Sequence, residues 1–175
     1  MEMKEFYYED GIRVSLFNLD HEAVSFHFHQ SVSDMIYCSK GSINIELPEL
    51  KQLYNVEHGN VFQIPPNVKH RFANGEDKGK PSQYVLLQIG IFDIEFMKNT
   101  RDLKNMLNDI KLESNASTPI YIESRKKDIL ALADKFACHK PEVLTTQENL
   151  DVITALRRFA EVGIETSYPI CDEIA

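Results

Sequence analysis

The stretch from Phe26 to Asn74 decides the fold of this chain, and it reads FHFHQSVSDMIYCSKGSINIELPELKQLYNVEHGNVFQIPPNVKHRFAN. Short apolar runs are separated here by turn residues, at the close and regular spacing that is typical of an antiparallel sandwich or barrel. The Pro65-Pro66 pair interrupts the pattern because proline has no N–H to donate to a neighbouring strand. We therefore predict successive short strands joined by turns, without βαβ units.

The polar residues that interrupt these apolar runs form a candidate metal site. His27 and His29 lie two apart in an alternating run, and the period of two in a strand places both imidazoles on one face. Asp34 and His70 are available from nearby strands. Imidazole and carboxylate donors suit first-row divalent metals, so we predict a zinc, iron, manganese or nickel ion on His27, His29, Asp34 and His70.

The same residues have a second interpretation. The three histidines could line a pocket that holds no metal. Asp34 could accept a hydrogen bond from an imidazole instead of binding a metal, since its side chain is one methylene shorter than that of glutamate. The residues alone leave both alternatives open.

Strands are also predicted on either side of the central stretch. Residues 12–18 alternate well enough to form a strand, and residues 84–92 form the longest and most apolar run. We therefore predict a β-barrel domain over residues 1–92. Residues 1–10 are expected to be frayed or to lie at a sheet edge.

Helical spacing replaces the strand pattern after Phe92. Residues 93–112 carry apolar side chains at helical spacing, and Ser124 can cap a second helix. Thr145 and Glu148 form a possible capping box for a third helix, which Gly163 would end. We therefore predict a helical C-terminal appendage over residues 93–175, packed on the barrel or at a dimer interface.

The first half of the central stretch resembles a signature motif of the cupin superfamily. That motif is a glycine, five residues, HxH, three or four residues, a glutamate, six residues and a glycine. Here His27, His29 and Gly41 match. The glutamate is replaced by Asp34, and His21 stands at the opening glycine.

The second half resembles the other cupin motif, which is a glycine, five residues, PxG, two residues, a histidine, three residues and an asparagine. Gly59, Pro65, His70 and Asn74 are in register. Asn67 replaces the second glycine, and asparagine tolerates the left-handed backbone that this position requires. The resemblance implies a jelly-roll barrel, a mainly β fold, with the three histidines and Asp34 turned into its mouth.

A narrower resemblance extends over more of the chain. The segments SDMIYCSKGSINIE, GNVFQIPPNVKHRF and YVLLQIGIF, followed by helices, are similar to the effector-binding domain of AraC-type transcriptional regulators. This resemblance implies a barrel that binds a small effector and helices that mediate dimerisation. The helix-turn-helix domain that follows in that family is absent from this sequence, so the chain is either a free-standing sensor or a fragment of a longer regulator.

Three further residues are candidate ligand contacts. Gln63 and Gln88 are polar residues in apolar strands, and a buried amide needs hydrogen-bond partners. Tyr37 is an aromatic candidate for the same role, although an aromatic residue in such a strand is more often part of the core.

Charge and composition exclude several classes of function. A formal net charge of −8 repels phosphate backbones, so direct nucleic-acid binding is not expected. No apolar run is long enough to span a bilayer, and the N-terminus lacks a secretory pattern. The three scattered cysteines, Cys38, Cys138 and Cys171, form no disulfide framework, which favours reduced thiols and a cytoplasmic location.

Two functions therefore fit the sequence. The first is a sensor-type cupin that binds a small molecule, with or without a metal, and whose helices mediate dimerisation. The second is a metal-dependent enzyme, an oxygenase or isomerase acting on a small organic or sugar-derived substrate. The apolar stripe over residues 150–159 favours a homodimer in either case.

Overall fold

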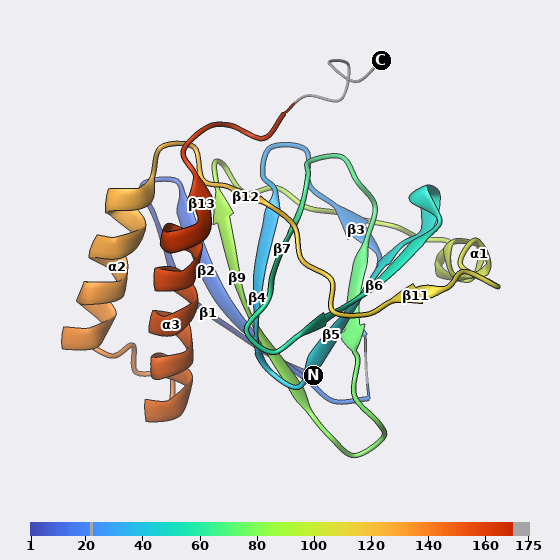
Figure 1. The fold of residues 1–175 in the computed structure, drawn as a ribbon, viewed down its shortest axis with the longest axis horizontal. Helices are drawn as coiled ribbons and strands as arrows, with labels where there is room; N and C mark the ends of the chain where they lie inside the picture. The colour runs from blue at the N-terminus through green and yellow to red at the C-terminus, as the bar shows by residue number, and fades with distance from the viewer. Residues whose placement is uncertain (22, 170–175) are drawn as a thin grey trace. The chain divides into compact units, whose positions relative to one another are not determined.

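The computed structural model describes residues 1–21 and 23–169 (Figure 1). The chain divides into two compact units, Met1–Thr118 and Pro119–Ala175. The first contains the barrel, and the second contains two long helices and a pair of short strands.

The larger sheet of the first unit is antiparallel, and its strand order is β1-β2-β9-β4-β7. Residues 1–10, expected to be frayed or to lie at an edge, contain the edge strand of this sheet. The sheet consists of β1 (Glu2–Glu9), β2 (Ile12–Leu19), β9 (Ser82–Ile89), β4 (Asp34–Lys40) and β7 (Val61–Ile64).

The second sheet has the order β11-β6-β5-β8, and a short pair, β10-β3, lies beside the site described below. A backbone bridge between His27 and His70 connects β3 to the segment that leads into β8. The strands are β11 (Leu112–Glu113), β6 (Gln52–Glu57), β5 (Ser42–Leu47), β8 (Arg71–Asn74), β10 (Glu95–Phe96) and β3 (His27–Phe28), and a single 3-10 turn, η1 (Pro48–Leu50), joins β5 to β6.

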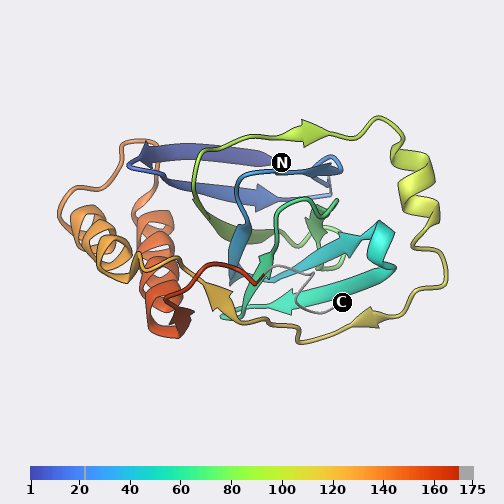
Figure 2. The same cartoon turned by 90° about the horizontal axis from the view of Figure 1, so that it is seen from above.

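The core of the barrel lies between the two sheets. Figure 2 shows β1 and β2, in blue, across from β5 and β6, in teal. Alternate residues of both sheets point inward and pack together, as the period of two in a strand requires. The buried cluster contains Phe17, Leu19, Ile36, Cys38, Ile43, Ile45, Leu47, Val56, Phe62, Ile64, Phe72, Tyr84 and Leu86.

Two turn residues predicted from the motifs adopt the expected backbone. Gly41 has a φ of +66°, and a Cβ atom there would lie 2.9 Å from the Glu76 side chain, so the turn between β4 and β5 needs glycine. Asn67 also has a φ of +66°, in the position that the cupin motif gives to glycine. The left-handed turn is therefore present despite the substitution.

The helical structure expected over residues 93–112 is present only in a short central part of that segment. This segment instead forms β10, a short helix α1 (Thr100–Asn105) and β11. Its apolar residues do not form one helical stripe: Leu103 and Leu107 pack against Phe26, while Phe96 is 57% exposed. Pairing of β10 with β3 and of β11 with β6 overrides the helical spacing. The first compact unit consequently extends to Thr118, beyond the expected change of structure at Phe92.

The second unit contains β12 (Ile120–Tyr121), α2 (Lys126–Cys138), α3 (Thr146–Val162) and β13 (Gly163–Ile164). The predicted capping box of α3 is confirmed: Thr145 Oγ1 accepts the amide of Glu148, whose carboxylate accepts the amide of Thr145. The helix ends before Gly163, as expected. Ser124 does not cap α2, because its hydroxyl donates to the carbonyl of Glu165.

The apolar stripe of α3 is mostly buried. Ile153, Leu156 and Phe159 are buried, whereas Leu150 is 52% exposed. Most of the side chains on which the expected homodimer depended therefore need no second copy to cover them. The homodimer stays a prediction.

Two further expectations concern membranes and cysteines. None of the described helices has both the length and the apolar character needed to cross a bilayer. Cys38 is buried and Cys138 is exposed, and both are free thiols. Cys171 lies outside the described residues.

Candidate metal centre and its cavity

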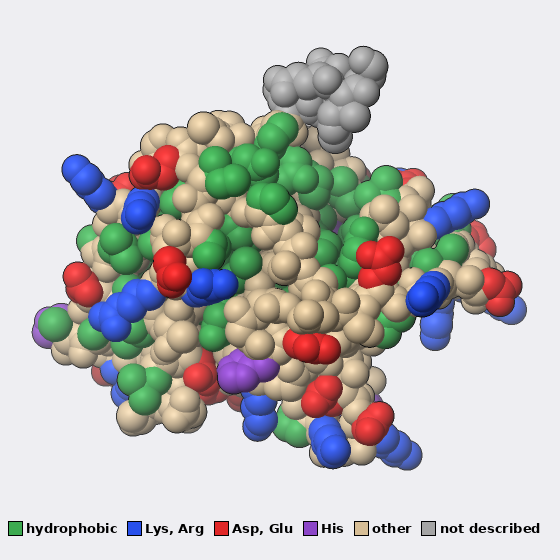
Figure 3. Space-filling model, viewed as in Figure 1, with side chains coloured by type: hydrophobic (Ala, Val, Ile, Leu, Met, Phe, Trp, Pro, Cys, Tyr) green, Lys and Arg blue, Asp and Glu red, His purple; other side chains and the backbone are tan. Residues whose placement is uncertain are grey.

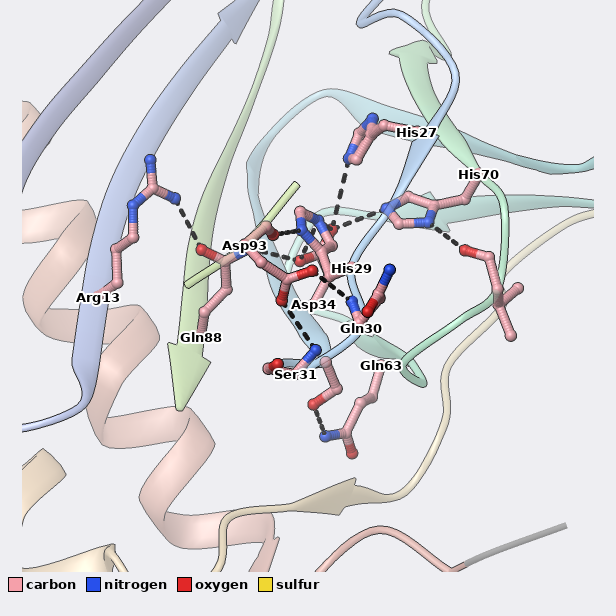
Figure 4. A network of polar contacts seen from close by, with 12 residues as sticks. Arg13, His27, His29, Gln30, Ser31, Asp34, Gln63, His70, Gln88 and Asp93 are labelled. Carbon is pink, nitrogen blue, oxygen red and sulfur yellow. Dashed lines mark hydrogen bonds and ion pairs between the residues drawn. The ribbon is translucent and has the colours of Figure 1, made fainter. Parts of the chain in front are cut away.

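The four predicted metal ligands meet at one end of the barrel. His27 lies in β3, His29 follows it, Asp34 begins β4, and His70 directly precedes β8. All four side chains are buried, and one ligand atom from each lies within 4.8 Å of the others. Figure 4 shows the three imidazoles arranged around the Asp34 carboxylate. The predicted residues are therefore brought together.

Each imidazole is held by a backbone carbonyl through its Nδ1 atom. His27 Nδ1 lies 2.7 Å from the Ser25 oxygen, His29 Nδ1 2.6 Å from the Asp93 oxygen, and His70 Nδ1 2.7 Å from the Val68 oxygen. A carbonyl oxygen can only accept, so each Nδ1 must carry the proton and donate it. In the neutral ring, Nε2 then has a lone pair available for a metal.

The Asp34 carboxylate faces these Nε2 atoms. Its Oδ2 atom lies 2.8 Å from His70 Nε2 and 3.2 Å from His29 Nε2. Its Oδ1 atom accepts a hydrogen bond of 2.7 Å from Gln88 Nε2. Because Nδ1 holds the proton in each ring, a neutral imidazole would direct its lone pair at the carboxylate. The contact therefore requires a positive charge, either a second proton on the ring or a metal ion between the donors.

The pKa values reflect this crowding. Burial, reinforced by the charge of His70, lowers the pKa of His27 to about 4. Burial also acts to lower the pKa of His29, but the hydrogen bond and charge of Asp34 outweigh it and the pKa rises. Burial acts to raise the pKa of Asp34, yet the hydrogen bonds from His29 and His70 lower it well below its usual range. The carboxylate is therefore ionised and ready to bind a cation.

The spacing of the donor atoms fits a metal ion. Bonds of about 2.1 Å place two donor atoms about 3.0 Å apart at a right angle and about 4.2 Å apart across the ion. The Asp34 oxygens lie 3.1 Å from His29 Nε2, 2.8 Å from His70 Nε2 and 4.0 Å from His27 Nε2. Three neutral imidazoles and one carboxylate are therefore suited to a first-row divalent metal.

A cavity of about 350 Å³ adjoins this cluster within the first unit. His27, His29 and Asp34 line it, so a metal ion bound to them would face it. Most of the other walls are apolar, and they include Met3, Phe17, Val24, Phe72, Leu86, Phe92, Ile94 and Phe96. This volume is at the small end of the range for ligand sites.

Only one of the three predicted ligand contacts lies at the cavity. Gln88 lines it, and its amide joins Asp34 to Arg13. Gln63 instead pairs with Met35, whose side chain points away from the face of Asp34, and it donates to Ser33 Oγ at 2.7 Å. Tyr37 shares that opposite face and does not line the cavity. Neither Gln63 nor Tyr37 lines this cavity, and their role as ligand contacts stays a prediction.

Four residues at the site were not identified from the sequence. Arg13, Glu5 and Phe92 line the cavity, and Asp93 holds the loop after His29 through hydrogen bonds from the amides of Gln30 and Ser31. The available signal was weak: Arg13 is a charged residue in a strand whose neighbours are apolar. Its role depends on which face of that strand turns inward, and the sequence does not specify this.

Comparison with known proteins identifies the fold. No family model and no curated protein matches the chain. A cupin-like protein from Thermotoga maritima is 15% identical over 62% of this chain and 85% of its own, with a TM-score of 0.51. A Klebsiella pneumoniae protein with a double-stranded β-helix domain is 12% identical over 55% of this chain and 84% of its own, with a TM-score of 0.50. The chain therefore has the cupin jelly-roll fold, followed by C-terminal α-helices.

Proposed function

We propose that this protein binds one divalent transition metal ion on His27, His29, Asp34 and His70, and a small molecule in the adjoining cavity. One observation carries the proposal. Three buried imidazoles, each with Nδ1 committed to a backbone carbonyl, direct their Nε2 atoms at one buried carboxylate. A pocket that only enclosed an organic ligand would not need this arrangement.

Metal-dependent catalysis is the function that this geometry supports best. Four protein donors leave up to two of about six coordination positions open for a substrate or water. Three of the four ligands line the cavity, so the open positions would face a bound molecule. When bound, the metal would supply Lewis-acid or oxygen chemistry. The protein's own residues hold the ligand tautomers, exclude water with apolar walls and present Arg13 beside the centre.

A sensor-type role, similar to that of the AraC effector domain, is the second candidate. The compact helical unit that follows the barrel favours it, because a sensor must transmit binding to a partner surface. In that case the barrel would bind a ligand without converting it.

The first experiment measures metal content by mass spectrometry in protein loaded with iron, manganese, nickel or zinc and then desalted. We expect about one equivalent in the wild type and little in the His27→Ala/His70→Ala variant. The matched control is His21→Ala/His58→Ala, which removes two exposed histidines and should retain the metal. Absence of metal in the wild type, or equal metal in all three proteins, would contradict the proposal.

A second experiment distinguishes enzyme from sensor. Metal-loaded protein is incubated with a panel of small organic and sugar-derived molecules, and oxygen uptake and product formation are followed. Turnover that His70→Ala abolishes supports the enzyme. Saturable binding without turnover supports the sensor.

A further inference from the structure

A buried arginine lies in the wall of the cavity. Arg13, in β2, is 7% exposed. Its Nη1 donates to Gln88 Oε1 at 2.7 Å, and its guanidinium lies 4.0 Å from the centre of the Phe92 ring. Gln88 in turn donates to Asp34. The arginine is therefore a fixed positive charge in an apolar cavity, connected to the metal cluster through one amide.

The carboxylate that neutralises Arg13 is supplied by an exposed residue. Glu5 lies in the edge strand β1, its side chain is 52% exposed, and it pairs with Arg13 Nη2. A register shift in β1 falls between Glu5 and Tyr7, so the pairing of this edge with β2 is already irregular there. Glu5 can move into water at little cost, whereas Arg13 cannot.

The cavity wall contains another polar group, the hydroxyl of Tyr84, which has no hydrogen-bond partner among the described residues. Tyr84 lines the cavity and is fully buried, and its hydroxyl makes no hydrogen bond to any described residue. The ring is fixed by stacking on Phe17 at 4.8 Å and by contact with Phe72. Burial raises the pKa of Tyr84 well above its usual value, so the hydroxyl stays neutral and can donate. An unsatisfied buried hydroxyl destabilises the folded protein, and a ligand that accepts its hydrogen bond would remove this penalty.

We propose that the cavity takes a small organic carboxylate with an apolar body, whose carboxylate replaces that of Glu5 on Arg13. Exchange of one carboxylate for another keeps the buried arginine paired. The apolar body would lie against Phe17, Phe92 and Phe96, and an acceptor atom on it would reach the Tyr84 hydroxyl. This inference deepens the proposed function and rests on it, because a divalent ion on three neutral imidazoles and one carboxylate adds a positive charge that attracts the same anion.

The test compares carboxylates with their neutral amides by isothermal titration calorimetry. The probes are 4-methoxybenzoate, 4-methoxyphenylacetate and 3-(4-methoxyphenyl)propanoate, whose ether oxygen supplies the acceptor on the apolar body, and each is paired with its amide. Glu5→Gln removes the internal competitor but leaves Arg13, so we expect at least tenfold tighter binding of at least one carboxylate than in the wild type, with no change for its amide. The matched control is Glu46→Gln, which removes the carboxylate partner of Arg71, another arginine that lies over a phenylalanine ring but outside the cavity. The control should bind as the wild type does.

Three outcomes would overturn the inference: amides that bind as tightly as carboxylates, a Glu5→Gln variant with unchanged affinity, or no carboxylate binding by the wild type and Glu5→Gln at millimolar concentration. Each protein is assayed both metal-loaded and after chelator treatment, and its metal content is measured. If the protein holds no metal but still binds carboxylates, the metal proposal has failed while the carboxylate site stands.

Discussion

At the scale of single residues, the hydrogen bonds of the imidazoles define the chemistry of the site. The spacing of His27, His29, Asp34 and His70 could be predicted because the two motifs fix all four positions. The backbone partner of each Nδ1 could not be predicted. It depends on how the carbonyls of Ser25, Asp93 and Val68 are turned, and side-chain identity does not encode this.

The lowered pKa of His27 predicts acid sensitivity of the metal-free protein. The folded pKa is about 4, against about 6.5 in the unfolded chain, so between these values the unfolded state binds a proton that the folded state does not. The free energy of unfolding should therefore fall by roughly 3 kcal/mol as the pH drops from 6.5 to 4. The raised pKa of His29 has the opposite effect: its protonation stabilises the folded state, and this stabilisation is lost as the pH rises through the folded-state pKa. The lowered pKa of Asp34 stabilises the folded state at higher pH, and this stabilisation is lost as the pH falls below the pKa of the unfolded chain.

Urea unfolding of chelator-treated protein from pH 4 to 6.5 measures this effect. The control is His27→Gln, which cannot titrate and should lose most of the slope in this range. An equal slope in both proteins would show that another group is responsible.

The unpartnered hydroxyl of Tyr84 predicts an uncommon response to truncation. In the ligand-free protein Tyr84→Phe should leave stability unchanged or raise it by about 1 kcal/mol, because it removes a buried group without a partner. Tyr8→Phe is the comparison, since the Tyr8 hydroxyl accepts the amide of Phe92 at 2.9 Å. Thermal unfolding of both variants decides the matter. A loss of stability in Tyr84→Phe larger than that in Tyr8→Phe would contradict the expectation.

At the scale of elements, strand register separates Gln88, which lines the cavity, from Gln63, which does not. Gln88 and Gln63 are both glutamines in apolar strands, and the sequence does not distinguish them. Met35 in β4 pairs with Gln63 of β7 on one side and with Leu87 of β9 on the other. Gln63 therefore lies on the same face as Met35. Gln88 follows Leu87, so its side chain lies on the opposite face, which is the face of Asp34. A period of two gives two faces, but only the pairing of strands tells which face is inside.

The loop between β3 and β4 depends on a residue from the opposite end of the barrel sequence. Asp93 accepts the amides of Gln30 and Ser31 at 2.7 and 2.8 Å, and its own carbonyl accepts His29 Nδ1–H. Burial acts to raise the pKa of its carboxyl, but the hydrogen bonds from the two amides outweigh this effect and the pKa is lowered. Asp93→Ala should release the loop and weaken metal binding by about tenfold, as removal of groups that orient metal ligands generally does.

Competition with a chelator of known affinity measures this change. Asp102→Ala removes an exposed aspartate of α1 and serves as the control. Equal metal affinity in Asp93→Ala and the wild type would exclude a positioning role for the Asp93 side chain.

At the scale of the whole molecule, the boundary of the barrel was harder to predict than its centre. Residues 93–112 have helical spacing, but two short strand pairings and the contact of Leu103 and Leu107 with Phe26 determine their structure. Such contacts are distant in sequence, and local periodicity does not report them. The later helices were predicted better, because the capping box of Thr145 and Glu148 is local.

The surface of the molecule carries mixed charge, and it would also have to provide the interface of the predicted homodimer. Acidic and basic side chains are interspersed on the face that Figure 3 presents, and the net charge is −8. The predicted homodimer would have to use a surface other than the buried side chains of α3, and Leu150 is an exposed apolar residue of that helix at which to test it. Light scattering should give twice the chain mass of 20.2 kDa. A Leu150→Glu variant that stays dimeric would show that the interface lies elsewhere. A monomeric wild type would contradict the predicted homodimer.

The carbonyl partners of the three imidazoles have a consequence for how this barrel can change. A backbone oxygen has no side chain to lose, so substitutions at Ser25 and Val68 leave the acceptors of His27 and His70 in place. The orientation of these imidazoles therefore depends little on which side chains surround them. Cavity walls such as Phe17, Ile94 and Phe96 could be varied together to admit new molecules while the metal geometry is kept. This separation makes the barrel a suitable scaffold for directed evolution of specificity.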